Sequence, residues 1–487
     1  MLTLIATSPP TERELGYLEA ARSLAHLDTE KLLLPILLQL IVIVAAARLF
    51  GALARRVGQP SVVGEIVAGL VLGPSFLGWL FPDAFAAVFR PSLGIGQELS
   101  DALLAKVFTV IAQIGLIFLL FLVGLEFEGR HVREHGRAAV FISIAGIVVP
   151  FALGASLAPL IHPYLEPHPA RGQPVPLLGL TLFLGVALAI TAIPVLGRIM
   201  MELGITRTRL GAITITAAAV DDAVGWILLA SVAAVVHANF DPAATIRMGG
   251  LTIAFVLFMI FVARPLMLRY FNASFRRSGG EVGPTAMAML FVGLFLSAVA
   301  TNLIGIFAVF GAFLFGAVLS GQPQVREAAR AKLRDVVTGF FVPVFFTYTG
   351  LRTDITGLKS TAVLWIGAAI IVAAVGGKLI GCGLAARASG FRWKEAGIIG
   401  AMMNARGLMA LIAVNLGYEL GVVPPSLYAV LVIMALITTM LTTPLLLWLR
   451  RGTELEEPIA RSGFVRSFHP PENHSSTHNA SACGAPF

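Results

Sequence analysis

Apolar stretches long enough to cross a lipid bilayer fill most of this 487-residue chain. An α-helix needs about 20 such residues to span a hydrocarbon core of ~30 Å. Thirteen runs of suitable length lie near 33–53, 61–78, 104–126, 138–161, 176–202, 209–236, 248–268, 284–303, 305–320, 336–351, 362–386, 396–416 and 425–449. We therefore predict an all-α polytopic membrane protein with about thirteen transmembrane helices.

Basic residues gather in alternate loops between these runs. Arg207 and Arg209 follow the fifth run, Arg326 and Arg330 follow the ninth, and Arg450 begins the segment after the thirteenth. Cytoplasmic loops carry such an excess of arginine and lysine. We therefore expect a multi-pass protein of the bacterial inner (plasma) membrane, with its N-terminus outside and its C-terminus in the cytoplasm. The net charge of +8 follows from this pattern, and no nucleic-acid partner is expected.

Three regions are expected along the chain. Residues 1–30 form an extracytoplasmic N-terminal segment, and residues 31–450 form a membrane transporter domain. Residues 451–487, rich in Pro, Ser, His and Asn, are predicted to be a short disordered cytoplasmic tail.

Two pairs of similar segments recur in the same order in the two halves of the domain. The segment 64–73 resembles 311–320, and the segment 121–126 resembles 346–352. An odd number of crossings separates the members of each pair, so they run in opposite directions through the bilayer. This order predicts inverted five-helix repeats, 61–236 and 305–449, although glycines shared by chance among close-packed helices would explain either match alone.

The fifth and twelfth runs, which the repeat makes equivalent, are both interrupted. Pro194 follows Thr191 in the fifth run, and proline removes a backbone donor from a helix. Asn404 and Arg406 place polar groups at the corresponding depth of the twelfth run. Two discontinuous helices that cross in this way would present their ends and free backbone groups to an ion.

Charged side chains inside the apolar runs are the candidates for transport chemistry. Asp221 and Asp222 lie in the sixth run and Lys378 in the eleventh. Neighbouring residues on a helix diverge by about 100°, so one acid is expected to pair with Lys378 while the other faces a cavity. That acid could hold a proton or a small monovalent cation, and the two would compete.

Other interpretations of these charges remain open at this stage. The acids could form a structural network with Lys378 or Arg406, and Lys378 could extend to the membrane surface. Arg406 could stabilise the interrupted helix or contact the substrate. Glu65 is interpreted as structural or as part of a cytoplasmic funnel, and no cofactor is expected.

These motifs together resemble the monovalent cation:proton antiporter-2 (CPA2) family, which includes sodium/proton antiporters and plant-type cation/H+ exchangers. They comprise residues 59–74, 121–126, 191–198, 220–226, 345–353, 377–378 and 404–407. The resemblance implies a homodimer with the sodium/proton antiporter fold, which exchanges Na+ or K+ for protons electrogenically. It implies that Asp222 binds the cation and the proton, that Asp221 pairs with Lys378, and that Thr191 lines the site.

Three rival functions were weighed against this one. A cation channel would need a continuous polar pore. A Kef-like potassium efflux system would carry a nucleotide-binding regulatory domain, for which the short tail leaves no room. An intramembrane aspartyl protease would need two converging carboxylates, whereas adjacent acids on a helix diverge, so an enzyme is not expected.

Overall fold

The structure is a computed structural model that describes residues 28–125, 129–167, 175–236, 242–277, 282–352, 361–462 and 464. Every regular element among these residues is helical, and each of the thirteen predicted runs overlaps a helix. Ten stretches are long and apolar enough to cross a membrane. The other three runs correspond to a helix of 12 residues, a helix with a π-helical turn and a helix pair with a break. The predicted all-helical membrane class is therefore confirmed.

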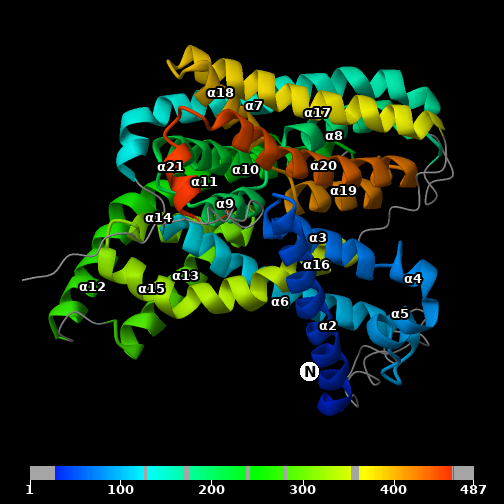
Figure 1. Cartoon of the computed structure of the whole chain (residues 1–487), viewed down its shortest axis with the longest axis horizontal. Coiled ribbons are helices and arrows are strands. Elements are labelled where there is room, and N and C mark those ends of the chain that lie inside the picture. Colours follow the sequence, from blue (N-terminus) through cyan, green and yellow to red (C-terminus); the bar gives the residue numbers. More distant parts are fainter. Residues whose placement is uncertain are drawn as a thin grey trace, which may run out of the picture.

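One group of helices forms what we call the flanking bundle. It contains α2 (Thr29–Arg56), α3 (Ser61–Leu72), α6 (Gln97–Leu125), α13 (Pro284–Ile304), α14 (Ala308–Leu319) and α16 (Val342–Leu351). The short helices α4 (Leu77–Leu80) and α5 (Pro82–Phe89) follow α3, whereas α15 (Pro323–Val336) and the π-helical turn η3 (Val337–Phe341) lead into α16. This bundle occupies the lower part of Figure 1.

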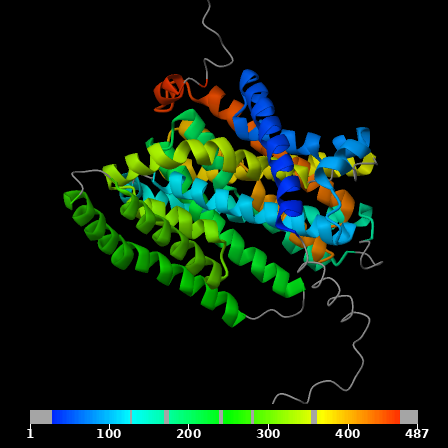
Figure 2. The ribbon, with the colours of Figure 1, turned by 90° about the horizontal axis from the view of Figure 1, so that it is seen from below.

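The second group, which we call the crossing bundle, packs around α7 and α17. It contains α7 (Gly129–Ile161), α8 (Leu177–Ala189), α9 (Ile193–Leu203), α10 (Arg209–Val236), α17 (Thr361–Ala388), α18 (Trp393–Met403), α19 (Leu408–Glu419) and α20 (Pro425–Leu449). The turn η1 (His162–Tyr164) closes α7. Helices α11 (Pro242–Phe258) and α12 (Arg264–Arg277), joined by the π-helical turn η2 (Met259–Ala263), link the bundles. Figure 2 shows this link in green along one side of the molecule.

The two halves of the chain use the same helix contacts, as an internal repeat requires. Helix α3 packs on α16 just as α14 packs on α6, and α7 meets α17 between the halves. At the first crossing, a Cβ on Gly69 would overlap Thr347 O; at the second, a Cβ on Gly316 would overlap Phe121 O. Only glycine lets these backbones approach so closely. Helices α2 and α13 correspond in the same way, because each packs against the first glycine of the helix that follows it, Gly64 of α3 or Gly311 of α14. The similarity between the halves therefore begins one helix before each predicted repeat.

The described part of the predicted disordered tail is ordered, which differs from the expectation. Residues after α20 include α21 (Glu456–Arg461), with Leu455 and Ile459 fully buried. Leu210 N, at the start of α10, donates a 2.5 Å hydrogen bond to Glu454 Oε1. A few apolar residues therefore hold this polar segment against the crossing bundle. Residues 465–487, and residues 1–27 of the predicted N-terminal segment, lie outside the described residues.

The basic loops after the fifth, eleventh and thirteenth runs meet on one face. Arg209 after the fifth run lies 2.6 Å from Glu395 after the eleventh. Lys394 Nζ donates to Arg451 O, after the thirteenth run, at 3.0 Å. We call this the basic face, defined by the loop 204–208, the loop 389–392 and residues 450–464.

Candidate functional site

Two broken helices cross at the centre of the crossing bundle. Helix α8 ends at Ala189 and α9 begins at Ile193, with extended backbone at Ile190 and Ala192 between them. Pro194 lies in the first turn of α9, where a missing N–H leaves no hydrogen bond unmade. The equivalent break separates α18 from α19 at residues 404–407. The two discontinuous helices predicted from the sequence are therefore present.

The breaks hold each other through hydrogen bonds across the crossing. Thr191 Oγ1 donates to Met403 O at 3.0 Å, and Ala192 N donates to Ala405 O at 3.1 Å. Thr191 is fully buried. Each extended segment thus provides hydrogen-bond partners for main-chain groups of the other, because buried polar groups need such partners. Thr191, the residue predicted to line the site, lies at this crossing.

Arg406 stabilises the end of α8. Its guanidinium donates to Ala187 O at 2.8 Å and to Leu188 O at 2.5 Å, the last carbonyls of that helix, and to Ala374 O at 3.4 Å. A cation at a helix C-terminus offsets the negative end of the helix dipole. Of the two roles left open for Arg406, these contacts support the stabilisation of the interrupted helix.

Two threonines of α20 support the second break, and they were not among the predicted site residues. Asn404 Nδ2 donates to Thr438 O at 3.3 Å, and Arg406 N donates to Thr439 Oγ1 at 3.1 Å. Thr439 Oγ1 in turn contacts Arg406 O. Both threonines are fully buried. The hydroxyl of Thr439 in an apolar span is the sequence signal that could have identified this residue, whereas Thr438 contributes a main-chain oxygen that no side chain marks.

Asp221 forms a buried ion pair with Lys378. Lys378 Nζ lies 2.7 Å from Asp221 Oδ2, and both side chains are fully buried. A Cβ placed on Gly146 of α7 would lie 2.5 Å from Cys382 Sγ, so a glycine there lets α17, the helix of Lys378, pack closely on α7. The pair joins α10 to α17 inside one bundle. Such a pair is stable only when both charges are present, because desolvation costs each of them several kcal/mol.

Asp222 follows Asp221 on α10, so its side chain leaves the helix about 100° around the axis from that pair. Its side chain is 1% exposed, and its Oδ1 has no hydrogen-bond partner within the described parts of the chain. Trp226, one turn further along the same face of α10, packs on Phe307 at the start of α14, with ring centroids 5.0 Å apart. Asp222 therefore faces the boundary between the two bundles. A buried carboxylate oxygen without a partner is costly and is a natural ligand for a proton or a hard cation.

Glu65 belongs to a second charged cluster, at the boundary between the bundles. Arg198 of α9 lies 3.8 Å from Glu65 of α3 and 2.9 Å from Glu202. Glu202 Oε2 also accepts a 2.9 Å hydrogen bond from Ser61 N, at the start of α3. The structure thus separates Glu65 from Asp221 and Asp222 in its contacts. Arg198 and Glu202 lay at the end of a predicted run, and their position alone gave no sign of this contact.

The central site is suited to a single small cation. Groups of three or more His, Cys, Asp or Glu side chains that could hold a metal ion are absent from the described residues. A single carboxylate provides hard oxygen ligands, which suit a small hard cation. Exchange of a proton for a cation at such a group requires only that the two compete for one carboxylate.

Comparisons with known proteins agree with the fold and the motifs. Residues 41–449 match the family model described as "Sodium/hydrogen exchanger, transmembrane". The chain is similar to Na(+)/H(+) antiporter NhaS4 of Synechocystis sp., with 38% identity over 86% of this chain and 98% of the relative. It is 34% identical to Cation/H(+) antiporter 17 of Arabidopsis thaliana over 85% of this chain, and it spans about half of that relative, 48% of its length.

A solved structure supports the fold alone. The sodium proton antiporter MjNhaP1 from Methanocaldococcus jannaschii matches with a TM-score of 0.54 and 15% identity, over 87% of this chain and 98% of that one. The family match covers most of the membrane domain, including both broken helices, both acids and Lys378. The chain therefore belongs to the sodium/hydrogen exchanger family.

Proposed function

We propose that this protein is a secondary active antiporter that exchanges Na+ or K+ for protons at Asp222. The observation that carries the proposal is the buried Asp222 carboxylate, which faces the boundary between the bundles and has an oxygen without a hydrogen-bond partner among the described residues. The family and the names of the two similar antiporters support the same reaction. Cation and proton compete for Asp222, so the binding of one releases the other.

Asp221 and Lys378 adjust the charge of the site. In the unloaded site Lys378 is neutralised by Asp221 at 2.7 Å. The proton on Asp222 leaves before the cation binds, and the bound cation, unlike a proton held on one oxygen, also attracts the neighbouring Asp221 carboxylate, which weakens the hold of Asp221 on Lys378. Lys378 can then release a proton, so more protons than cations cross in one cycle. Exchange would therefore be electrogenic.

Movement of the crossing bundle against the flanking bundle would expose Asp222 to one side and then to the other. The crossing bundle contains both broken helices together with Asp221, Asp222 and Lys378, so it can move as one body. The flanking bundle then remains fixed and is the surface on which two copies pair as a homodimer. We assign the basic face to the cytoplasm of a bacterial cell, because cytoplasmic loops carry the excess of arginine and lysine.

The test is antiport in proteoliposomes that carry an imposed pH gradient, reported by an internal pH-sensitive dye. Sodium and potassium are added separately, and each is expected to collapse the gradient only if it is transported. Asp222→Asn should abolish exchange while the protein keeps its elution profile and thermal stability. Asp101→Asn, the same chemical change in the surface pair with Arg90, is the control and should exchange normally.

Two outcomes would contradict the proposal. Undiminished exchange by Asp222→Asn would remove this carboxylate from the mechanism. Cation flux without any proton movement in the wild type would identify a channel, the first alternative. Potassium exchange without sodium exchange would keep the antiport reaction and favour a potassium efflux system, the second alternative.

A further inference from the structure

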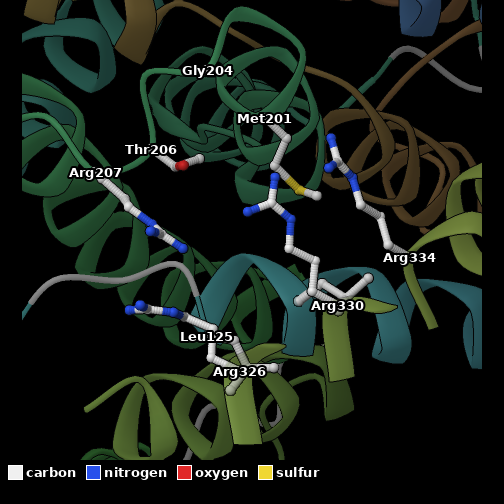
Figure 3. Close-up of a pocket in the computed structure, with 9 residues that line it drawn as sticks. Leu125, Met201, Gly204, Thr206, Arg207, Arg326, Arg330 and Arg334 are labelled. Carbon is white, nitrogen blue, oxygen red and sulfur yellow. The ribbon is translucent and has the colours of Figure 1, made fainter. Parts of the chain in front are cut away.

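A pocket of about 220 Å³ opens between the two bundles at the basic face. Its lining comes from the end of α6, the end of α9 with the loop that follows it, and α15: Leu122, Leu125, Met201, Gly204, Thr206, Arg207, Arg326, Arg330 and Arg334. Figure 3 shows Arg207 extending from the loop after α9, while Arg326 and Arg330 extend from α15 toward the same gap. The pocket therefore lies where the two bundles face each other.

The described lining of this pocket is basic. Four of its nine lining residues are arginines, and none of these nine described residues is acidic. Arginine stays protonated at any physiological pH. Arg326, Arg330 and Arg334 follow one another at intervals of four, so they lie along one face of α15, whereas Val325 and Ala329 of the same helix are buried. This helix thus directs a row of guanidinium groups into the pocket.

We propose that this pocket binds a phosphate-bearing anion. Guanidinium groups match phosphate oxygens in pairs of parallel hydrogen bonds, and the hydroxyl of Thr206 adds a further donor at the same site. Basic pockets between transmembrane helices on the cytoplasmic side bind phosphate headgroups of lipids. A lipid headgroup and free inorganic phosphate offer the same chemistry, and the experiment below separates them.

The bound anion would restrain transport. Arg207 and Thr206 follow α9 of the crossing bundle, whereas the other three arginines belong to α15, which leads into the flanking bundle. An anion held by residues of both bundles binds more tightly to the present arrangement than to an arrangement in which the bundles have moved apart. Its binding therefore increases the population of the present arrangement. This regulatory step rests on the proposed antiport, whereas the binding of the anion does not.

Binding is tested directly, without any transport assay. Purified protein in an uncharged detergent is equilibrated with radiolabelled inorganic phosphate, with chloride as the competing anion. Saturable binding is expected, and Arg326→Gln/Arg334→Gln should weaken it about tenfold or more, because each change removes charged hydrogen bonds. Arg269→Gln on the exposed surface of α12 is the matched control and should bind as the wild type does.

Proteoliposomes distinguish the two sources of phosphate. Exchange is measured in phosphatidylcholine alone, with and without phosphate on the side of the basic face, and in phosphatidylcholine containing phosphatidylglycerol. Slower exchange with free phosphate, relieved by the double arginine variant, supports a soluble ligand. Slower exchange only with phosphatidylglycerol, relieved by the same variant, supports a lipid headgroup. If the wild type binds phosphate but does not exchange cations, the proposed function fails while this inference stands.

The proposal is overturned if the pocket takes neither ligand. The first such result is that phosphate does not bind saturably and that the arginine variant does not change the effect of the lipid. The second concerns Glu126 and Glu128, the nearest acids along the chain after Leu125, which lie outside the described residues. Phosphate binding that appears only in Glu126→Gln/Glu128→Gln would show that the chain neutralises the pocket with its own carboxylates.

Discussion

Lys378→Met is expected to destabilise the protein, because it leaves the buried Asp221 without its cation. Lys378 Nζ lies 2.7 Å from Asp221 Oδ2, and Asp221 Oδ1 has no hydrogen-bond partner among the described residues. Methionine matches the length of the lysine stem, so the packing changes little. Removing one partner of a buried ion pair costs about 3–5 kcal/mol.

The cost of keeping the unpaired carboxyl neutral has the same magnitude. In the variant, Asp221 can avoid a buried charge by holding a proton. A carboxyl that ionises near pH 4 in water must then stay protonated at pH 7, and at about 1.4 kcal/mol per pH unit this costs ~4 kcal/mol. The unfolded chain ionises freely over this range, so the penalty grows as the pH rises and shrinks by about 1.4 kcal/mol for each unit that it falls.

The assay is thermal unfolding in detergent at mildly acidic and at neutral pH, followed by the fluorescence of the five tryptophans. Lys378→Met should unfold at a lower temperature than the wild type, with the larger difference at neutral pH. Asp221→Asn/Lys378→Met, which removes both charges, should recover most of the loss. Lys106→Met on the exposed face of α6 is the control. A single variant as stable as the double variant at both pH values would refute the reasoning.

Two further predictions concern the helix crossings. In Gly124→Ala the new Cβ would overlap Phe313 O of α14, so stability should fall by about 1–3 kcal/mol; Gly376→Ala, which meets no atom within 4 Å, should be neutral or slightly stabilising in the same thermal assay. Arg406→Met leaves the carbonyls of Ala187 and Leu188 without their donor and should cost about 1.5–3 kcal/mol, whereas Arg406→Lys should lose less because it keeps the charge. Weaker cation affinity in Arg406→Lys at unchanged stability would instead place Arg406 in the ion site.

The positions of the helices and of the two breaks followed from the sequence because each has a local cause. A run of apolar residues must span the membrane as a helix, and Pro194 cannot continue one without loss of a hydrogen bond. The pairing of one acid with Lys378 was also accessible, because a buried lysine requires a counter-charge and adjacent residues on a helix cannot face the same partner.

The partners of Arg406 and the position of the C-terminal segment could not be predicted in this way. Arg406 donates to main-chain carbonyls of α8, and every residue offers a carbonyl, so no sequence pattern marks the acceptor. The segment after α20 is polar in composition, and among its described residues only Leu455, Ile459 and Phe464 are buried. Three apolar residues in a polar segment are a weak sequence signal. Their burial is nevertheless enough to hold the segment when an adjacent helix provides an apolar surface.

The division of the acid pair between two environments constrains how the ion pair can open. Asp221 and Lys378 both belong to the crossing bundle, on α10 and α17, so movement of that bundle as one body leaves their 2.7 Å contact unchanged. Asp222 faces the other way, toward the boundary with α14 that Trp226 and Phe307 mark. In the proposed mechanism, movement between the bundles would change the surroundings of Asp222 and leave the ion pair intact. The charge bound at Asp222 would then act on Lys378 across a single residue, through Asp221, without any rearrangement inside the bundle.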